Sequence, residues 1–286
     1  MTFDSIDQLF DPDLSSINRL PMTGVGARRA AAVDLDGEWD FRLLPTCEVP
    51  PGWLEAETGG ADWRKIRVPG VWTRQDTGDL PHYTNIMMPW PGRPPGVPLA
   101  FPTGLHRTSF ERPAGERVLL EVGGAESLLV VWCNGNFVGM GKDSRLASTF
   151  DLTPHLVAGT NELAALVTRW CDATWIEDQD HWYHAGIHRS VRLVTTPSTR
   201  IDDVILTADY DTSTGGRLEV EVEIGTQDRL EAGWSVRVDS AELALVMTAP
   251  VPAEPRPDGI EAQIDAYDFQ GLAARIVRPD LAVEPW

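Results

Sequence analysis

The clearest local signal in the chain reads Leu128-Leu129-Val130-Val131-Trp132-Cys133-Asn134-Gly135-Asn136-Phe137-Val138-Gly139. Two runs rich in apolar residues, 128–133 and 136–139, flank the dipeptide Asn134-Gly135. Asn-Gly is the preferred centre of a two-residue type I′ turn, because both of its residues must adopt a positive φ angle. The stretch therefore predicts a β-hairpin in the middle of the chain.

Strand-like patterns continue on both sides of this hairpin. Before and after it, strands are predicted at residues 36–43, 117–122, 161–170 and 187–195. Further on, Leu218, Val220, Val222 and Ile224 alternate with three glutamates, which indicates a strand with one buried and one acidic face. Two more strands are predicted at residues 234–238 and 243–246. No segment after residue 34 shows the hydrophobic periodicity of a helix over a useful length. The predicted fold class is therefore all-β.

The order of these segments suggests three regions. Residues 1–34 read as an extended arm with one short helical turn near residues 5–10, and residues 35–197 form a first β-domain. A proline-rich loop between Met87 and Pro102 is irregular, because proline lacks the N–H donor that a sheet requires. Pro197-Ser198-Thr199 resembles a domain joint, and residues 198–286 form a second β-domain.

Composition excludes several classes of protein. The chain of 286 residues has a net charge of −19, which repels phosphate backbones and argues against a nucleic-acid partner. No apolar run is long enough to span a membrane, and the amino terminus does not read as a signal peptide, which favours a cytoplasmic protein. The widely spaced Cys47, Cys133 and Cys171 predict free thiols rather than disulfides or a zinc site. Eleven tryptophans suit either a packed core or stacking on sugar rings.

The densest polar cluster spans residues 175–184 and reads Trp-Ile-Glu-Asp-Gln-Asp-His-Trp-Tyr-His. Its three carboxylates suit a hard cation, and its aromatic rings suit the wall of a sugar pocket. A solvated acidic loop is the competing interpretation. His181 and His184 do not form the HExxH pattern of a zinc site, and no serine-nucleophile, P-loop or dinucleotide motif occurs.

Several of these stretches together resemble the amino-terminal half of glycoside hydrolase family 2, and its β-galactosidase branch in particular. The resemblance runs from about residue 15 to 210 and is carried by residues 35–41, 68–72, 82–85, 132–139, 143–146, 150–152, 177–182 and 186–189. It implies a jelly-roll, galactose-binding-like β-sandwich followed by an immunoglobulin-like β-sandwich that is incomplete at its carboxyl end. The Ala185 to Val191 stretch also resembles β-glucuronidases of the family.

The family's catalytic glutamates lie on a (β/α)8 barrel outside these 286 residues, so the resemblance implies that the chain alone is inactive. The barrel would come from the same gene or from a companion chain, and hydrolysis of terminal β-D-galactosides would follow a retaining mechanism. A stand-alone carbohydrate-binding module and a β-glucuronidase-type protein are the alternatives. Because relatives in this family are often oligomers, the resemblance also makes a homo-oligomer an expected partner state.

Two substrate-binding residues carry over from the resemblance. Asn85 matches the asparagine whose amide contacts galactose, and Asp180 matches the aspartate that contacts a galactose hydroxyl and helps to bind Na⁺ with ligands from the barrel. An amide donates and accepts hydrogen bonds, and a carboxylate accepts from hydroxyls. The resemblance implies Mg²⁺ for the full enzyme only. Some relatives bind Mg²⁺ in this first domain, but here the two ligand positions are Lys142 and Asp172, and an ammonium beside that carboxylate would replace the metal.

Overall fold

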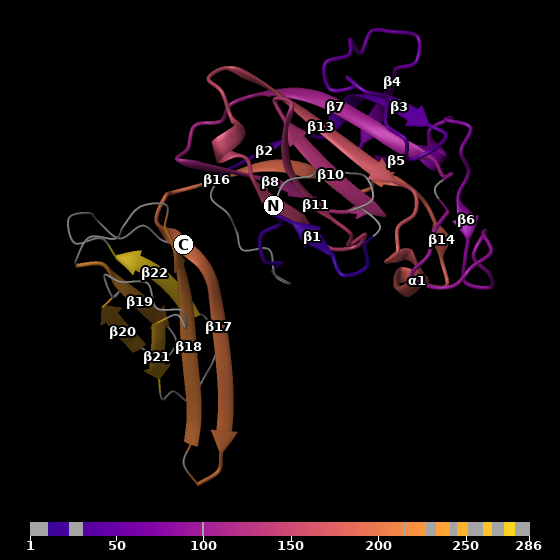
Figure 1. Ribbon diagram of the computed structural model, residues 1–286. Coiled ribbons are helices and arrows are strands. Elements are labelled where there is room, and N and C mark those ends of the chain that lie inside the picture. Colours follow the sequence, from indigo (N-terminus) through magenta and orange to yellow (C-terminus); the bar gives the residue numbers. More distant parts are fainter. Residues whose placement is uncertain are drawn as a thin grey trace. The chain divides into compact units, whose positions relative to one another are not determined.

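The computed structural model describes residues 11–22, 31–98, 100–213, 215–226, 233–240, 245–250, 260–264 and 272–277. The chain divides into two compact units, residues 1–196 and 197–286 (Figure 1). The helical turn expected near residues 5–10 lies outside the described residues. None of the helices in these ranges is long and apolar enough to cross a membrane.

The first unit is built from two main antiparallel sheets. Strands β1 to β16 are Ser16–Ile17, Ala31–Asp34, Gly37–Leu44, Arg64–Val68, Gly70–Val71, His82–Tyr83, Thr103–Glu111, Arg117–Val122, Ala125–Glu126, Leu128–Cys133, Asn136–Gly141, Ser148–Asp151, Thr160–Thr168, Trp182–Tyr183, Gly186–Ile187 and Val191–Thr196. One sheet has the order β1-β11-β10-β13-β7-β3-β4 and the other β12-β8-β16-β2. The unit is therefore a β-sandwich, which confirms the predicted all-β class.

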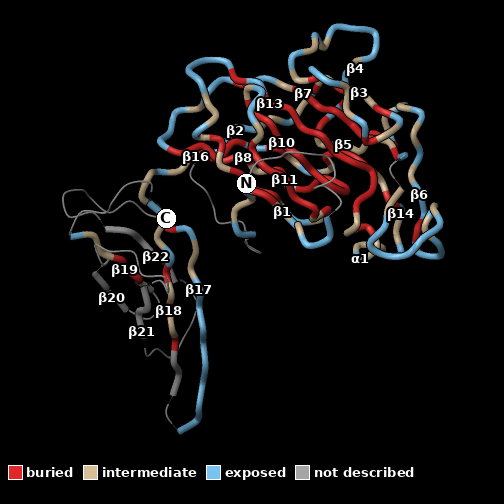
Figure 2. The backbone as a smooth tube through the Cα atoms, in the orientation of Figure 1, coloured by how far each residue is buried: buried red, intermediate tan, exposed pale blue. Residues whose placement is uncertain are grey.

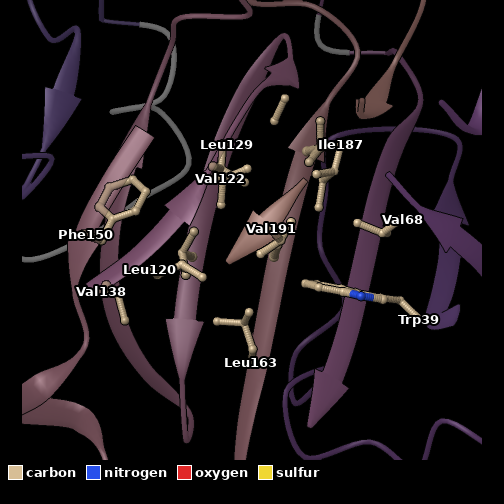
Figure 3. Packing of buried hydrophobic residues seen from close by; sticks show 14 of the residues in the cluster. Trp39, Val68, Leu120, Val122, Leu129, Val138, Phe150, Leu163, Ile187 and Val191 are labelled. Atoms are coloured by element: carbon tan, nitrogen blue, oxygen red, sulfur yellow. The ribbon is translucent and has the colours of Figure 1, made fainter. Parts of the chain in front are cut away.

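The core lies between these two sheets. Phe41 and Leu163 of the larger sheet pack in one cluster with Leu120, Phe150 and Leu193 of the smaller one. Figure 3 shows part of this cluster, including Leu120, Phe150 and Leu163. Alternate residues of each strand point into the cluster, as the two-residue period of a strand requires.

Strand β10 is buried along its whole length, which explains its unbroken apolar sequence. Leu129 and Val131 face the central cluster, whereas Leu128, Val130 and Trp132 face a second cluster that includes Trp53 and Leu105. The predicted turn after β10 is confirmed, since Asn134 has a φ of 50° and Gly135 a φ of 76°. Figure 2 shows β10 as one of the buried strands.

The described parts of the expected amino-terminal arm belong to the sandwich. Strand β1 pairs with β11 at the edge of the larger sheet, and β2 pairs with β16 in the smaller one. Residues 16–17 and 31–34 of the predicted arm are thus strands of the first β-domain rather than an unpaired extension. The sequence pattern missed this because strands of two and four residues are too short to show a period.

The second unit is also a β-structure. Its described strands are β17 (Arg200–Asp211), β18 (Gly215–Gly225), β19 (Ser235–Ser240), β20 (Leu245–Pro250), β21 (Ile260–Ile264) and β22 (Leu272–Val277). They form two antiparallel sheets with the orders β17-β18-β21 and β20-β19-β22. Leu218, Val220 and Val222 are buried and Glu223 is exposed, as the alternation in β18 predicts.

Candidate functional site

The two predicted substrate residues flank a short antiparallel ribbon of β6 and β14. Tyr83 of β6 pairs with Trp182 of β14, and their rings are in contact with centroids 5.8 Å apart. The Tyr83 hydroxyl donates a hydrogen bond to the Asp180 carboxylate. Asn85 follows Tyr83 by two residues and Asp180 precedes Trp182 by two, so the register sets both at the same end of the ribbon. Both are exposed.

A buried arginine holds the β6 side of this ribbon. Arg169 forms an ion pair with Asp79, and its Nη2 lies 2.6 Å from the carbonyl oxygen of Leu80 and 2.7 Å from Nδ1 of His82. The guanidinium also stacks over the Trp170 ring at 5.1 Å. Burial lowers the pKa of Arg169. A fork of donors at this point fixes the chain that leads to Tyr83 and Asn85.

The three carboxylates of the acidic segment have different surroundings. Glu177, at the end of helix α1 (Thr174–Glu177), accepts hydrogen bonds from the Ser144 backbone N–H at 2.8 Å and the Ser144 hydroxyl at 2.5 Å. Burial raises the pKa of Glu177. Asp178 accepts from the Thr84 hydroxyl. Glu177 and Asp178 therefore hold the segment in place, and Asp180 is the carboxylate presented to solvent.

Aromatic rings hold the proline-rich loop against the same region. The Trp90 ring lies 4.9 Å from Trp170 and 5.7 Å from Trp175. The Trp175 indole N–H donates to the carbonyl oxygen of Gly96 at 3.0 Å. Trp170 is buried, as the core interpretation predicts, whereas Trp90 and Trp175 are half-buried and pack against it or against each other. Trp182 differs, because 59% of it is exposed beside Asp180.

A hollow of about 300 Å³ lies next to the ribbon. Its polar wall consists of Glu126, Arg145 and the imidazoles of His181, His184 and His188, and two further residues complete it, Val71 and Trp182. The sequence interpretation missed Glu126, Arg145 and His188 as site residues. The spacing of the three histidines was visible in the sequence, whereas their convergence with Glu126 and Arg145 depends on the pairing of β15 with β5 and β9.

Charges in this hollow are paired. Glu126 is buried, and its Oε1 lies 2.7 Å from Nη2 of Arg145. His181 accepts a hydrogen bond from Arg145 through Nε2 at 3.3 Å, and His188 donates through Nε2 to the Ser144 carbonyl oxygen at 2.7 Å. Burial lowers the pKa of His184 and of His188. The hollow is therefore close to neutral in charge and rich in hydrogen-bonding groups.

Lys142 and Asp172, where the sequence departs from the metal-binding relatives, form a buried ion pair. Lys142 Nζ lies 2.8 Å from an Asp172 carboxylate oxygen and 2.6 Å from the carbonyl oxygen of Asp11. An ammonium between these oxygens occupies the space that a cation would need, so the residues do not fit Mg²⁺ there. In the part of the chain that the structure describes, no group of three or more histidine, cysteine, aspartate or glutamate side chains is placed to hold a metal.

The first unit is thus a β-sandwich with exposed polar and aromatic groups beside a small hollow, and small-molecule sites in proteins are concave with a few placed polar groups. The model of the family described as "Glycosyl hydrolases family 2, sugar binding domain" matches residues 33–197. The chain belongs to glycosyl hydrolase family 2, and its first unit is the family's sugar-binding domain.

Two similar curated proteins are both named Beta-galactosidase. The Beta-galactosidase of Vibrio vulnificus (strain CMCP6) is 37% identical over 239 residues, which are 81% of this chain and 22% of that protein. The Beta-galactosidase of Alteromonas mediterranea is 40% identical over 207 residues, which are 70% of this chain and 20% of that protein. The chain thus matches about a fifth of the length of these relatives.

Solved structures agree on the fold. A Bifidobacterium dentium beta-glucuronidase complexed with coumarin-3-O-glucuronide matches with a TM-score of 0.65 and 19% identity, over 91% of this chain and 47% of that one. A Beta-D-Mannosidase from Dictyoglomus thermophilum matches with a TM-score of 0.54 and 16% identity, over 87% and 34%. At these identities the likeness concerns architecture, not the sugar.

Proposed function

We propose that this chain is the amino-terminal, sugar-binding portion of a β-galactosidase that hydrolyses terminal β-D-galactosides. The observation that carries the proposal is the identity of 37% and 40% to curated proteins named Beta-galactosidase over most of the chain. The catalytic carboxylates lie on a barrel outside these 286 residues, encoded by the same gene or supplied by a companion chain. The proposal includes a cytoplasmic location and a homo-oligomer.

In this proposal Asn85 and Asp180 contact the terminal galactose from the side of the ribbon. The Asp180 carboxylate accepts from a sugar hydroxyl while the Tyr83 hydroxyl keeps it oriented. The Asn85 amide donates to one hydroxyl and accepts from another. Such contacts at hydroxyls away from the reacting bond position the substrate for the transition state.

The chemistry of Asp180 also fits a monovalent cation. A carboxylate oxygen is a suitable ligand for Na⁺, but one exposed carboxylate does not complete a coordination shell. The other ligands would therefore come from the barrel. Asp180 would then balance the charge of the ion and hold it beside the sugar.

Galactose is favoured over glucuronic acid by the charges near the ribbon. A sugar carboxylate requires an available cation, whereas Arg145 is already paired with the buried Glu126. A β-glucuronidase of this sequence would have to bind its acidic sugar beside Glu126, Asp178 and Asp180. That arrangement is electrostatically unfavourable.

The test begins with the reading frame beyond the codon for Trp286, which should encode or adjoin a barrel. The joined protein is then assayed with nitrophenyl β-D-galactoside and β-D-glucuronide. We expect hydrolysis of the galactoside, and a loss of kcat/KM of about ten- to hundredfold in Asp180→Ala, since a hydrogen bond to a charged group contributes roughly 1.5–3 kcal/mol.

Two controls accompany this assay. Asp209→Ala removes an exposed carboxylate in the second unit and should leave kcat/KM unchanged. The 286-residue chain alone should show no turnover. Preferred hydrolysis of the glucuronide, or full activity in Asp180→Ala, would overturn the proposal.

A further inference from the structure

We infer that the outer edge of strand β17 is an interaction surface for a second copy of this chain, whose own β17 pairs with it as an antiparallel strand. β17 lies at the end of the sheet β17-β18-β21, and among the described residues no strand pairs with its other edge. The inference rests on the homo-oligomer that the proposed function includes, and it names the surface that forms it. Only residues of the second unit are involved.

Strand β17 is exposed over most of its length and apolar in its middle. Residues 205–211 are all exposed, and Figure 2 shows most of the strand in the colour of exposed residues. Ile205 is 43% exposed and Leu206 is 51% exposed, although side chains of this kind are most often buried. The segment 204–208 reads Val-Ile-Leu-Thr-Ala and carries no charge. An unpaired edge of this composition is a template for another strand.

The backbone groups of this segment point alternately towards β18 and towards the open edge. The N–H groups of Val204 and Tyr210 each donate to the carboxylate of the preceding aspartate at 2.8 Å, which indicates that even-numbered residues direct their N–H groups to the open side. Leu206 lies two residues beyond Val204, so its N–H and carbonyl groups face the same edge. In the pairing, Val204 exchanges the carboxylate for a carbonyl oxygen of the second copy.

Charge complementarity selects one register for the two copies. Directly opposite residues of an antiparallel pair lie on the same face, so a twofold pairing is centred on a residue that opposes itself. With Ile205 at the centre, Leu206 opposes Val204 of the other copy, and apolar side chains meet. Thr207 then opposes Asp203, so a hydroxyl meets a carboxylate. Pairs of these kinds stabilise a sheet.

Neighbouring registers are less favourable. If the centre moves by one or two residues towards the β17-β18 turn, Asp203 opposes Asp209 or Asp211 of the other copy, and like charges directly opposite are destabilising. If it moves by one residue the other way, Asp203 opposes the apolar Ile205. The shift in register between Ile201 and Asp203 interrupts the strand and limits the pairing at that end. A twofold pairing uses the edge of each copy once, so it closes as a dimer.

The first test is sedimentation velocity of the 286-residue chain over a range of concentrations. We expect a reversible equilibrium of monomer and dimer. Ile205→Asp sets two carboxylates opposite each other and should leave only monomer. Because Ile205 is exposed, the fold should survive, and far-ultraviolet circular dichroism checks this. Ile176→Asp, the matched control, places the same charge at an exposed isoleucine of the first unit and should leave the equilibrium unchanged.

The second test reports the register. Ile205 opposes itself in a pair without hydrogen bonds, in which the two Cα atoms lie about 4.5 Å apart, within the range of roughly 4.4–6.8 Å that a disulfide spans. Ile205→Cys should therefore form a disulfide-linked dimer on mild oxidation, seen on a non-reducing gel. In Thr207→Cys the two thiols are separated along the paired strands, so no link should form. The native cysteines are buried and do not compete.

Three results would each overturn the inference. They are a chain that stays monomeric at every concentration, a dimer that persists in Ile205→Asp, and more cross-linking in Thr207→Cys than in Ile205→Cys. The hydrolysis assay of the joined protein is a separate measurement. Failure of the β17 contact is therefore distinguishable from failure of the proposed activity.

Discussion

The Lys142 ammonium lies 2.8 Å from the Asp172 carboxylate. Both side chains are almost completely buried, since only 4% of the Lys142 side chain and 11% of the Asp172 side chain are exposed. Removing one partner of a buried pair leaves the other charge without compensation. Lys142→Met should therefore lower the free energy of unfolding by about 3–5 kcal/mol, measured by urea denaturation. Arg192→Met breaks the exposed pair with Asp34 and should cost less than about 1 kcal/mol. Equal effects of the two variants would contradict this account.

The same pair predicts how the chain responds to a chelator. Because an ammonium already lies between the oxygens of Asp172 and Asp11, the first unit should not need a divalent ion for stability. EDTA and added Mg²⁺ should each leave the Tm of the wild-type chain unchanged. A rise in Tm with Mg²⁺ that disappears in Asp172→Asn would show that the lysine does not fill this place.

Arg169 should be needed for the ribbon that carries the substrate residues. In Arg169→Leu, the mostly buried Asp79 loses its partner and the carbonyl oxygen of Leu80 loses a donor. We expect a loss of about 3–5 kcal/mol and a changed near-ultraviolet circular dichroism spectrum, because Trp170 loses the stacked guanidinium. Lys65→Leu, which removes an exposed lysine paired with the half-buried Asp40, is the matched control. An unchanged tryptophan spectrum in Arg169→Leu would refute the assigned role.

Stability should fall in weak acid because of His106. Burial lowers its pKa to about 4, whereas an unfolded histidine titrates near about 6.5. At a pH between these two pKa values, the unfolded state binds a proton that the folded state does not. The free energy of unfolding is therefore unaffected above this pH range and falls by up to roughly 3 kcal/mol as the pH drops through it. Urea denaturation between pH 7.5 and 4 measures the slope. His106→Leu should reduce it and His155→Gln should not.

The three thiols should be protected in the folded chain. Cys47, Cys133 and Cys171 are buried, and burial raises the pKa of Cys133 and of Cys171 to about 11. The thiolate is the reactive form, so both access and ionisation oppose reaction. Ellman's reagent should react with no thiol in native buffer and with three in urea. Fast reaction of one thiol before unfolding would contradict the buried positions.

Sequence periodicity predicted several of the strands and the turn between two of them, but not the long strands β7 and β17. The Asn134-Gly135 dipeptide predicted the geometry of its turn, and the alternation of apolar and acidic residues predicted the buried face of β18. Both patterns lie within a few neighbouring residues. Strands β1 and β2 were missed because two or four residues do not define a period.

The candidate site was only partly visible in the sequence. The composition of the acidic segment indicated a candidate site. Its sequence did not show that Glu177 is hydrogen-bonded to Ser144 whereas Asp180 is exposed. The hollow was not visible, because Glu126 and Arg145 are separated from the histidines along the chain and meet through β-sheet pairing. Buried polar groups whose partners lie far along the chain leave no local pattern.

The turn that contains Ser144 and Arg145 supports both the acidic segment that ends in Asp180 and the hollow lined by Glu126 and His188. Ser144 binds Glu177 through its backbone N–H and hydroxyl and His188 through its carbonyl oxygen, while Arg145 binds Glu126. A protein engineer could therefore exchange the outward side chains of Asn85, Asp180 and Trp182 to change sugar preference and keep this turn unaltered. The recognition surface would then be replaceable without rebuilding its support.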